Sequence, residues 1–322
     1  MLFPLSGYAN RFQAMASSSI LAESLGASLR ICWEPQEVLP ASAGEVFSTD
    51  FCNSYCITPE QALDEFGVTR SAVPRYLHRD DSRGLITLAG HDRGEQAFIP
   101  DLRDMLANAS GARTLAIAAG GQFFLPNPDS QAASIRADFR DQRRRFYSTM
   151  LLREETEEAV RLAIADRCAF MGLHLRYSDR SHQAPLDRSI RRALRASTEA
   201  SGLTSLFIAS DTAAARDRWV IEAERLGLDP WYITHDSLAR SQASGSHAAL
   251  VDWRVLGHAQ RLVYFAESSF AVEAAVAGSG FDDSVALPAS AIRAAAVGVN
   301  RILESARTYP RRHGWRGPTG RA

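Results

Sequence analysis

The residue types that could do chemistry gather at three places in the second half of this chain, each directly after a short apolar segment. They are His174, Arg176 and Asp179 at the first place, Ser210 and Asp211 at the second, and Glu267, Ser268 and Ser269 at the third. A helix is expected to begin directly after the two serines. Backbone N–H groups and hydroxyls at a helix start bind anions, and an arginine beside them can hold a phosphate through two parallel hydrogen bonds. The combination indicates a ligand that carries a diphosphate.

Missing motifs narrow the kind of diphosphate site. The chain has no G-x-G-x-x-G, which leaves an ordinary dinucleotide site without support. It has no D-x-D either, so nothing indicates a metal that clamps the diphosphate. We therefore predict a site without a metal, in which Arg176 and the amides of Ser268 and Ser269 stabilise the charge of a departing nucleoside diphosphate.

The same residues have other interpretations, which the sequence leaves open. Ser268 and Ser269 could cap the helix that follows them. Asp211 could cap a helix or accept hydrogen bonds from a pair of N–H donors, such as the edge of a guanine, and neither is favoured. A hydrolase that uses Ser268 with a histidine is a further hypothesis, but no G-x-S-x-G surrounds that serine.

The 36 basic residues are all arginine, and the absence of lysine excludes several classes of enzyme. No Schiff base can form, which excludes pyridoxal-phosphate enzymes and Schiff-base aldolases. The lysines that P-loop NTPases and protein kinases require are missing as well. Any anionic ligand must therefore be held by arginine, by hydroxyls or by helix N-termini.

The composition of the 322 residues indicates a globular protein. At roughly 150 residues per domain, this length corresponds to about two domains. The net charge of −1 gives no expectation of binding to nucleic acid or to a membrane surface. Four cysteines are too few for a disulfide framework, and neither their spacing nor an H-E-x-x-H motif indicates a metal. No signal peptide or transmembrane segment is predicted, so we expect a cytoplasmic protein.

Short apolar strands alternate with helices, which predicts an α/β fold with parallel sheets. In the second half, strands are expected over 169–177, 205–209, 231–234, 261–266 and 284–287, and helices over 186–200, 212–226, 248–258 and 270–277. In the first half, strands are expected over 1–5, 28–33, 85–89 and 114–118, with a helix after the loop 6–11 and irregular structure over 40–80.

Two further segments are rich in arginine. Residues 138–153 are expected to form a solvated helix between the domains, with a phosphate-binding patch as the less favoured interpretation. Its arginines are Arg140, Arg143, Arg144, Arg145 and Arg153. Near the end of the chain, residues 297–307 are expected to form a closing helix and the basic tail 309–322 is expected to fray.

Four motifs resemble, in the same order, those of the GDP-fucose-dependent fucosyltransferases, which include α1,6-fucosyltransferases, nodulation fucosyltransferases and protein O-fucosyltransferases. GLHLRYSDR at 172–180 resembles their H-x-R-x-x-D motif, LFIASD at 206–211 their second motif, and AESSFAVEAA at 266–275 their third. SGYANRF at the start resembles their opening Gly-x-x-Asn loop, and Asp252 fits the usual aspartate ahead of the third motif. Similarity is weak between residues 40 and 150.

The resemblance implies a GT-B architecture, in which two Rossmann-like domains, residues 1–150 and 151–322, face a central cleft and the C-terminal one binds the donor. It implies an inverting glycosyltransferase that moves fucose or a related sugar from a GDP-sugar to an acceptor hydroxyl, with no metal or cofactor. The implied donor-binding residues are Gly7, His174, Arg176, Asp211, Ser268, Ser269 and Phe270, and the implied catalytic residues are Asn10, Arg11, Arg176 and Asp179. Arg176 would hold the β-phosphate, while His174 and Asp211 would contact the guanosine.

The acceptor and the catalytic base stay open. The acceptor is expected to be a small metabolite, a glycan or a peptide. Asp179 and Glu34 are the first candidates for the base, ahead of His182, His91 and Glu267. Phe270 and Arg180 replace a polar residue and a lysine that the family often has, which leaves the sugar open as well. The alternative hypothesis is a protein that keeps this fold and binds GDP or a GDP-sugar without turnover.

Overall fold

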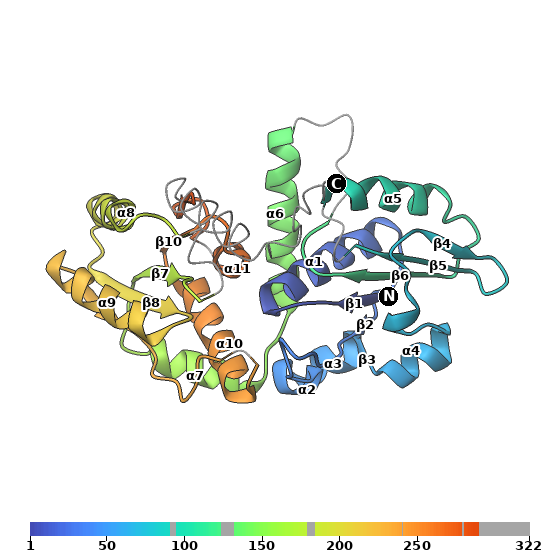
Figure 1. The fold of residues 1–322 in the computed structure, drawn as a ribbon, viewed down its shortest axis with the longest axis horizontal. Coiled ribbons are helices and arrows are strands. Elements are labelled where there is room, and N and C mark those ends of the chain that lie inside the picture. Colours follow the sequence, from blue (N-terminus) through green and yellow to red (C-terminus); the bar gives the residue numbers. More distant parts are fainter. Residues whose placement is uncertain (91–94, 124–131, 179–183, 240, 279, 290–322) are drawn as a thin grey trace, which may run out of the picture.

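The computed structural model describes residues 1–90, 95–123, 132–178, 184–239, 241–278 and 280–289. Two α/β halves lie beside each other, and helix α6 (Ala132–Thr149) stands between them (Figure 1). The predicted closing helix at 297–307 and the basic tail fall outside the described residues. Asp179, Arg180, His182 and His91 do so too. No helix in the described ranges is long and apolar enough to cross a membrane.

The N-terminal half is built on a six-stranded sheet with the strand order β3-β2-β1-β6-β5-β4. Its strands are β1 (Leu2–Pro4), β2 (Ile31–Cys32), β3 (Cys56–Ile57), β4 (His78–Asp80), β5 (Leu85–Ala89) and β6 (Thr114–Ala119). The pairs are parallel except for β4 with β5. Strand β5 is buried on both faces, with Ile86 in one apolar cluster and Leu85 in another. Helices that cover both faces require such continuous apolar strands.

The C-terminal half contains a five-stranded parallel sheet with the order β11-β10-β7-β8-β9. Its strands are β7 (Met171–Leu175), β8 (Ser205–Ser210), β9 (Asp229–Trp231), β10 (Arg261–Phe265) and β11 (Val285–Leu287). Strand β7 lies at the centre, and His174 is paired with Ala209 of β8 and Tyr264 of β10. This register sets the ends of all three strands at one edge of the sheet, as the sequence predicts.

Helices connect the strands of each sheet. In the N-terminal half they are α1 (Tyr8–Ser24), α2 (Ala43–Val46), α3 (Thr49–Tyr55), α4 (Pro59–Phe66), the 3-10 turn η1 (Arg70–Ala72) and α5 (Glu95–Ala107). After α6 follow α7 (Glu154–Ile164), α8 (Asp187–Ser201), α9 (Ala213–Arg225), α10 (Ala243–His258) and α11 (Ser269–Ala277). The boundary that we predict near residue 150 falls between α6 and α7.

Several predicted elements are wrong, for local reasons. Residues 40–80 are not irregular, because α2 and α4 each begin with a capping box, at Ser42 and at Thr58. Helix α7, in which only Thr156 and Val160 are buried, was not predicted. Strand β9 begins at Asp229, earlier than expected, because an edge strand tolerates the proline that follows.

Three arginines of α6 bind protein groups, whereas Arg145 is exposed as predicted. Arg143 is buried and pairs with Glu273 of α11 at 2.5 Å. Arg144 donates to the carbonyl oxygen of Val276, and Arg140 pairs with Asp282 at 2.7 Å. The helix does lie between the two halves, but these three side chains bind protein groups, so both the solvated helix and the phosphate-binding patch are wrong for them.

Aromatic side chains join the two halves. The ring of Phe12 in α1 lies 5.0 Å from Trp253 of α10 and 6.2 Å from Phe47, centroid to centroid. Trp33 and Tyr147 extend this group, and all five side chains belong to a single buried cluster. Aromatic pairs at such distances contribute beyond their buried area, so the halves share one core at the junction.

Phe12→Ala is expected to lower the free energy of unfolding by about 3–5 kcal/mol, the usual cost of removing a buried phenylalanine. Chemical denaturation followed by tryptophan fluorescence measures this change. Ile221→Ala, at a side chain that is 50% exposed, is the matched control and should change stability by less than about 0.5 kcal/mol. A similarly small effect for Phe12→Ala would contradict a shared core.

Candidate active site

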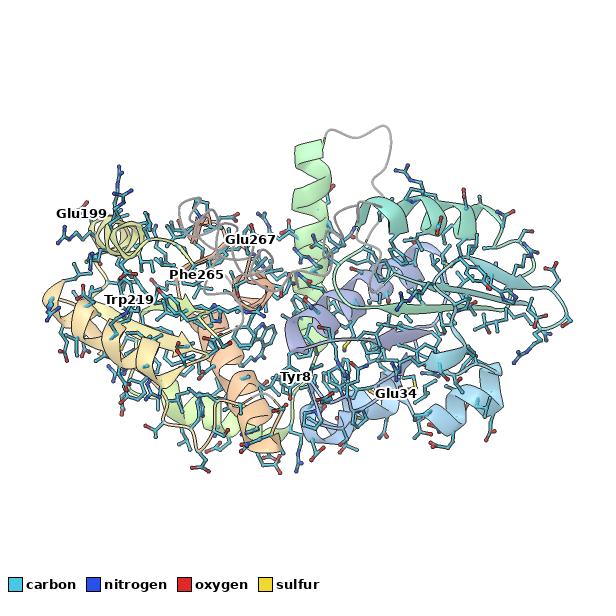
Figure 2. All side chains as sticks on the ribbon, in the orientation of Figure 1. Tyr8, Glu34, Glu199, Trp219, Phe265 and Glu267 are labelled. Carbon is cyan, nitrogen blue, oxygen red and sulfur yellow. The ribbon has the colours of Figure 1, made fainter. Side chains whose placement is uncertain are left out.

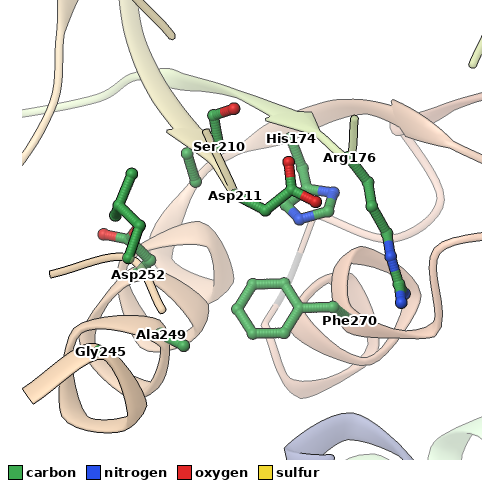
Figure 3. A pocket seen from close by; sticks show the side chains of 10 residues that line it. His174, Arg176, Ser210, Asp211, Gly245, Ala249, Asp252 and Phe270 are labelled. Carbon is green, nitrogen blue, oxygen red and sulfur yellow. The ribbon is translucent and has the colours of Figure 1, made fainter. Parts of the chain in front are cut away.

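A pocket opens at the carboxyl ends of β7 and β8, where ligands bind in open parallel sheets. Its cavity volume is ≈ 50 Å³. The lining residues are His174, Arg176, Ala209, Ser210, Asp211, Leu238, Gly245, Ala249, Asp252 and Phe270 (Figure 3). The pocket therefore brings together His174, Arg176, Asp211 and Phe270, four of the residues that the sequence predicts.

Strand β7 supplies His174, and Arg176 is the first residue after the strand. His174 and Arg176 are two residues apart, so they leave the strand on the same side. His174 is buried, with its Nδ1 3.3 Å from the hydroxyl of Ser268 and its ring 5.1 Å from that of Phe270. Arg176 is partly exposed and extends along the pocket, and the ring of Phe270 lies between it and Asp252 in Figure 3.

Asp211 holds the loop that follows β7. Its carboxylate accepts hydrogen bonds from the amides of Tyr177 at 2.8 Å and Ser178 at 3.1 Å, and from the Ser178 hydroxyl at 2.6 Å. The cap of α9 is Thr212, whose hydroxyl accepts from the amide of Ala215. Helix capping is therefore the wrong interpretation of Asp211, and the guanine contact stays a prediction that competes with these loop amides.

The third place is the start of α11. Ser268 is buried and caps the helix, since its hydroxyl accepts from the amide of Ala271 at 3.5 Å. The hydroxyl of Ser269 donates to Oδ1 of Asn10 at 3.1 Å. The capping interpretation is thus confirmed for Ser268, while Ser269 connects the C-terminal half directly to α1 of the N-terminal half. Glu267 before them is exposed.

The opening loop is held in an uncommon conformation. Ser6 has a φ of 73°, in the left-handed region that costs energy for a residue other than glycine. Its amide donates to Gln36, its carbonyl oxygen accepts from Arg11 at 2.8 Å, and its hydroxyl accepts from Asn10 at 3.1 Å. Gly7 then begins α1 without a side-chain cap, and a Cβ there would meet nothing within 4 Å. The helix start is therefore open.

Arg11 supports this loop from the interior. Its side chain is fully buried, its guanidinium lies 4.4 Å from the ring of Trp33, and Nη1 donates to the carbonyl oxygen of Glu34 at 2.9 Å. Burial lowers the pKa of Arg11 to about 10. The resemblance implies that Arg11 contacts the donor directly, whereas in this structure its contacts position the loop that bears Gly7 and Asn10.

None of the predicted catalytic bases that the structure describes lines the pocket. The carboxylate of Glu34 pairs with Arg70 at 2.6 Å. Glu34 lies within the N-terminal half, away from the junction of the halves, which Tyr8 marks in Figure 2. Glu267 is not among the pocket residues. Asp179, His182 and His91 lie outside the described residues, so the base stays unassigned.

Two pocket residues were not among the predicted site residues, although the resemblance had singled out Asp252 as the aspartate ahead of the third motif. Asp252 is buried in α10 and its Oδ1 lies 2.8 Å from Nε2 of His235. Gly245 allows the loop that contains Ala239 to approach α10, because a Cβ at Gly245 would lie 2.2 Å from the carbonyl oxygen of Ala239. A carboxylate between Val251 and Trp253 in an apolar run is the signal that could have placed Asp252 in the site, and no comparable signal marks His235.

Charge in the pocket is supplied by Arg176, Asp211 and Asp252. Across the described ranges, no group of three or more His, Cys, Asp or Glu side chains could hold a metal ion. The prediction that the reaction needs no metal stays a prediction.

Solved fucosyltransferases share this fold. NodZ α1,6-fucosyltransferase soaked with GDP-fucose matches with a TM-score of 0.55 and 14% identity, over 86% of this chain and 92% of that chain; NodZ has been solved from Bradyrhizobium. POFUT1 in complex with GDP-fucose matches with a TM-score of 0.51 and 12% identity, over 88% of this chain and 97% of the POFUT1 chain. A variant of Arabidopsis thaliana FUT1 in complex with GDP matches with a TM-score of 0.56 and 13% identity, over 86% of this chain and 68% of the FUT1 chain.

The chain has the GT-B fold. The predicted architecture of two α/β halves is thereby confirmed. No protein-family model matches the sequence, and no curated protein is significantly similar to it. The function must therefore be argued from the chemistry of the pocket.

Asp252→Asn is expected to raise the free energy of unfolding near neutral pH. Burial raises the pKa of Asp252, although the hydrogen bond with His235 opposes this. A carboxyl group whose pKa is raised by folding stabilises the folded state when protonated at low pH, and this contribution is lost as the pH rises through the folded pKa. The gain from asparagine should therefore shrink as the pH falls toward the ordinary pKa of an aspartate.

Chemical denaturation at a series of pH values measures this gain. Asp217→Asn, at an exposed carboxylate in α9 that pairs with Arg216, is the control, and it should show no gain at neutral pH. An Asp252→Asn variant that is less stable than the wild type at every pH would contradict the assignment of a costly buried charge.

Proposed function

We propose that the chain is an inverting glycosyltransferase that moves fucose, or a closely related sugar, from a GDP-sugar to an acceptor hydroxyl without a metal. One observation carries the proposal. A single pocket has Arg176 and Phe270, from the first turn of α11, on one side and the buried carboxylate of Asp252 on the other, on the fold that GDP-fucose transferases use. A nucleoside diphosphate has matching groups at its two ends.

The diphosphate is assigned to Arg176 and the start of α11. Two N–H groups of the guanidinium can hold one phosphate, and the first amides of α11 point outward with the positive end of the helix dipole. The open start of α1 at Gly7 lies close by, since Asn10 bonds to Ser269. These groups stabilise the negative charge that grows as the bond between the sugar and the β-phosphate breaks.

The guanine ring of the donor is assigned to the opposite end of the pocket. Phe270, Ala249 and Leu238 supply the apolar surface on which a flat ring can pack. Guanine presents two adjacent N–H donors, which match the two oxygens of a carboxylate. Asp252 fits this role better than Asp211, because both oxygens of Asp211 already accept hydrogen bonds from the loop after β7. His235 then fixes the orientation of Asp252.

In the proposed step, the acceptor oxygen forms a bond to the anomeric carbon of the sugar while the bond from that carbon to the β-phosphate oxygen breaks. The electron pair leaves with GDP, and the acceptor proton is released to solvent or to a base outside the described residues. Attack on the face opposite the leaving group inverts the configuration. Because Arg176 stabilises the leaving group, a strong base is less important when bond breaking runs ahead of bond making.

The alternative, a GDP-binding protein without turnover, has the same binding chemistry. It is favoured by the unassigned catalytic base and by Phe270, which replaces a polar residue that the family often has. Hydrolysis of GDP-fucose in the absence of an acceptor separates the two hypotheses. Slow release of GDP supports the transferase, because water then takes the place of the acceptor. Tight binding of GDP with no release, and with no transfer to a broad panel of acceptors, supports the binding protein.

Calorimetry with GDP, UDP and ADP in the presence of EDTA tests nucleotide recognition. GDP should bind more tightly than the other two, because only guanine offers two donors to Asp252, and EDTA should not weaken the binding. Preferred binding of UDP or ADP, or no binding of any of the three, would contradict the proposed function.

Arg176→Ala is expected to weaken GDP binding at least tenfold, which is about 1.4 kcal/mol, because a charged pair with a phosphate is lost. Arg192→Ala, at an exposed arginine on α8, is the matched control and should bind GDP as the wild type does. The same calorimetric titration measures both. An Arg176→Ala variant with unchanged affinity would remove Arg176 from the site.

A further inference from the structure

A buried carboxylate lies one turn behind the proposed phosphate-binding end of α11. Glu273 is fully buried and accepts three hydrogen bonds. Its Oε1 accepts from Gln13 Nε2 at 2.8 Å and from Arg143 Nη1 at 2.5 Å, and its Oε2 accepts from the hydroxyl of Tyr147 at 2.5 Å. The donors belong to α1 and α6, so this one side chain connects three helices.

Helix α11 contacts α1 at two successive turns. Ser269 bonds to Asn10, and Glu273 bonds to Gln13. Residues four apart on one helix and three apart on the other lie on matching faces. The turn that presents Ser268 and Ser269 is therefore held at a fixed place against the loop that presents Gly7 and Asn10.

Helix α6 fixes the other side of this contact. Arg143 and Tyr147 are one turn apart on α6, and Arg144 of the same helix donates to the carbonyl oxygen of Val276 in α11. Tyr147 also packs edge-on against Trp253, with the ring centroids 6.0 Å apart. Burial and the nearby carboxylate of Glu273 raise the pKa of Tyr147, so its hydroxyl stays a donor.

Stability alone does not account for a charge at this place. Removing a carboxylate from water is costly, and well-packed apolar side chains often replace a buried ion pair without loss of stability. What an apolar side chain cannot do is bind donors from two other helices in fixed directions. The hydrogen bonds of Glu273 set the distance and angle between α11 and α1, and this geometry is what the proposed reaction needs.

We propose that Glu273 is a positioning residue for sugar transfer. It holds the start of α11, which carries the donor diphosphate, in register with the opening loop on the other half, from which the acceptor hydroxyl approaches. This inference rests on the proposed function. The residues that line the pocket all come from the C-terminal half, and Gly7 of the N-terminal half lies near the pocket without lining it. A change at Glu273 therefore acts on the alignment for transfer and leaves the binding of GDP close to that of the wild type.

Two substitutions of Glu273 test the proposal. Glu273→Gln keeps an acceptor oxygen for Gln13 and Arg143, and should keep most of the transfer rate. Glu273→Leu removes every contact and should lower kcat at least about tenfold, since a misplacement of about 1 Å can cost 100-fold, while the Kd for GDP changes little. Glu222→Leu is the matched control, because that glutamate pairs with Arg191 and Arg225 on the surface of α9. It should transfer as the wild type does.

Gln13→Ala keeps the pair of Glu273 with Arg143 and removes only the bond to α1, so it decides the question if Glu273→Leu does not fold. Amide hydrogen exchange at residues 6–10 and 269–272 provides a readout that needs no activity. Exchange at both segments should rise in Glu273→Leu and Gln13→Ala and stay at the wild-type level in Glu273→Gln and Glu222→Leu.

Unchanged exchange at both segments in the folded variants would overturn the proposal. A parallel fall of kcat and GDP affinity would also overturn it, because it would indicate a general structural role. If the wild type neither binds GDP nor transfers sugar, the proposed function fails, and the exchange measurement still decides whether Glu273 sets the position of α11 against α1.

Discussion

The parallel pairing of β7 with β8 on one side and β10 on the other is the constraint on which the site depends. His174 is paired with Ala209 and Tyr264 in this register, so the residues that follow the three strands meet at one edge. A shift by one residue in β7 would turn its side chains to the other face of the sheet. Met171, Leu173 and Leu175 share one apolar cluster, and a shift would carry His174 into it, which fixes the register. The chemistry of the pocket follows from this register.

Contact between the halves adds a second constraint. In the proposed reaction the donor and the acceptor would meet across the junction of the halves. This junction combines an aromatic group around Phe12 with buried polar contacts. Tyr8 bonds to Ser246 next to the pocket, and Asn10 bonds to Ser269 at the start of α11. The apolar contacts supply stability, whereas the hydrogen bonds specify one alignment. The strained Ser6 and buried Arg11 lie where this alignment matters.

The sequence predicted β5 and the strands around the pocket, because these are short apolar runs bounded by polar residues. It missed β3 and β4 and placed β9 too late. It also predicted His174, Arg176, Asp211 and Phe270, which the pocket brings together. It did not predict the partners of these residues. The bond of Asp211 to Tyr177 and Ser178, and that of Asp252 to His235, connect residues far apart in sequence, and no local pattern encodes such pairs. Arg143 was misjudged for the same reason, since only tertiary structure places Glu273 against it.

The central claim is that one pocket recognises both ends of a guanosine diphosphate, and a crystal structure of the chain with GDP tests it most directly. We predict that the guanine base lies within hydrogen-bond distance of Asp252, with the ring of Phe270 beside it. The β-phosphate should bind to Arg176 and to the first amides of α11. GDP bound elsewhere, or bound in this pocket with its base at Arg176, would contradict the account.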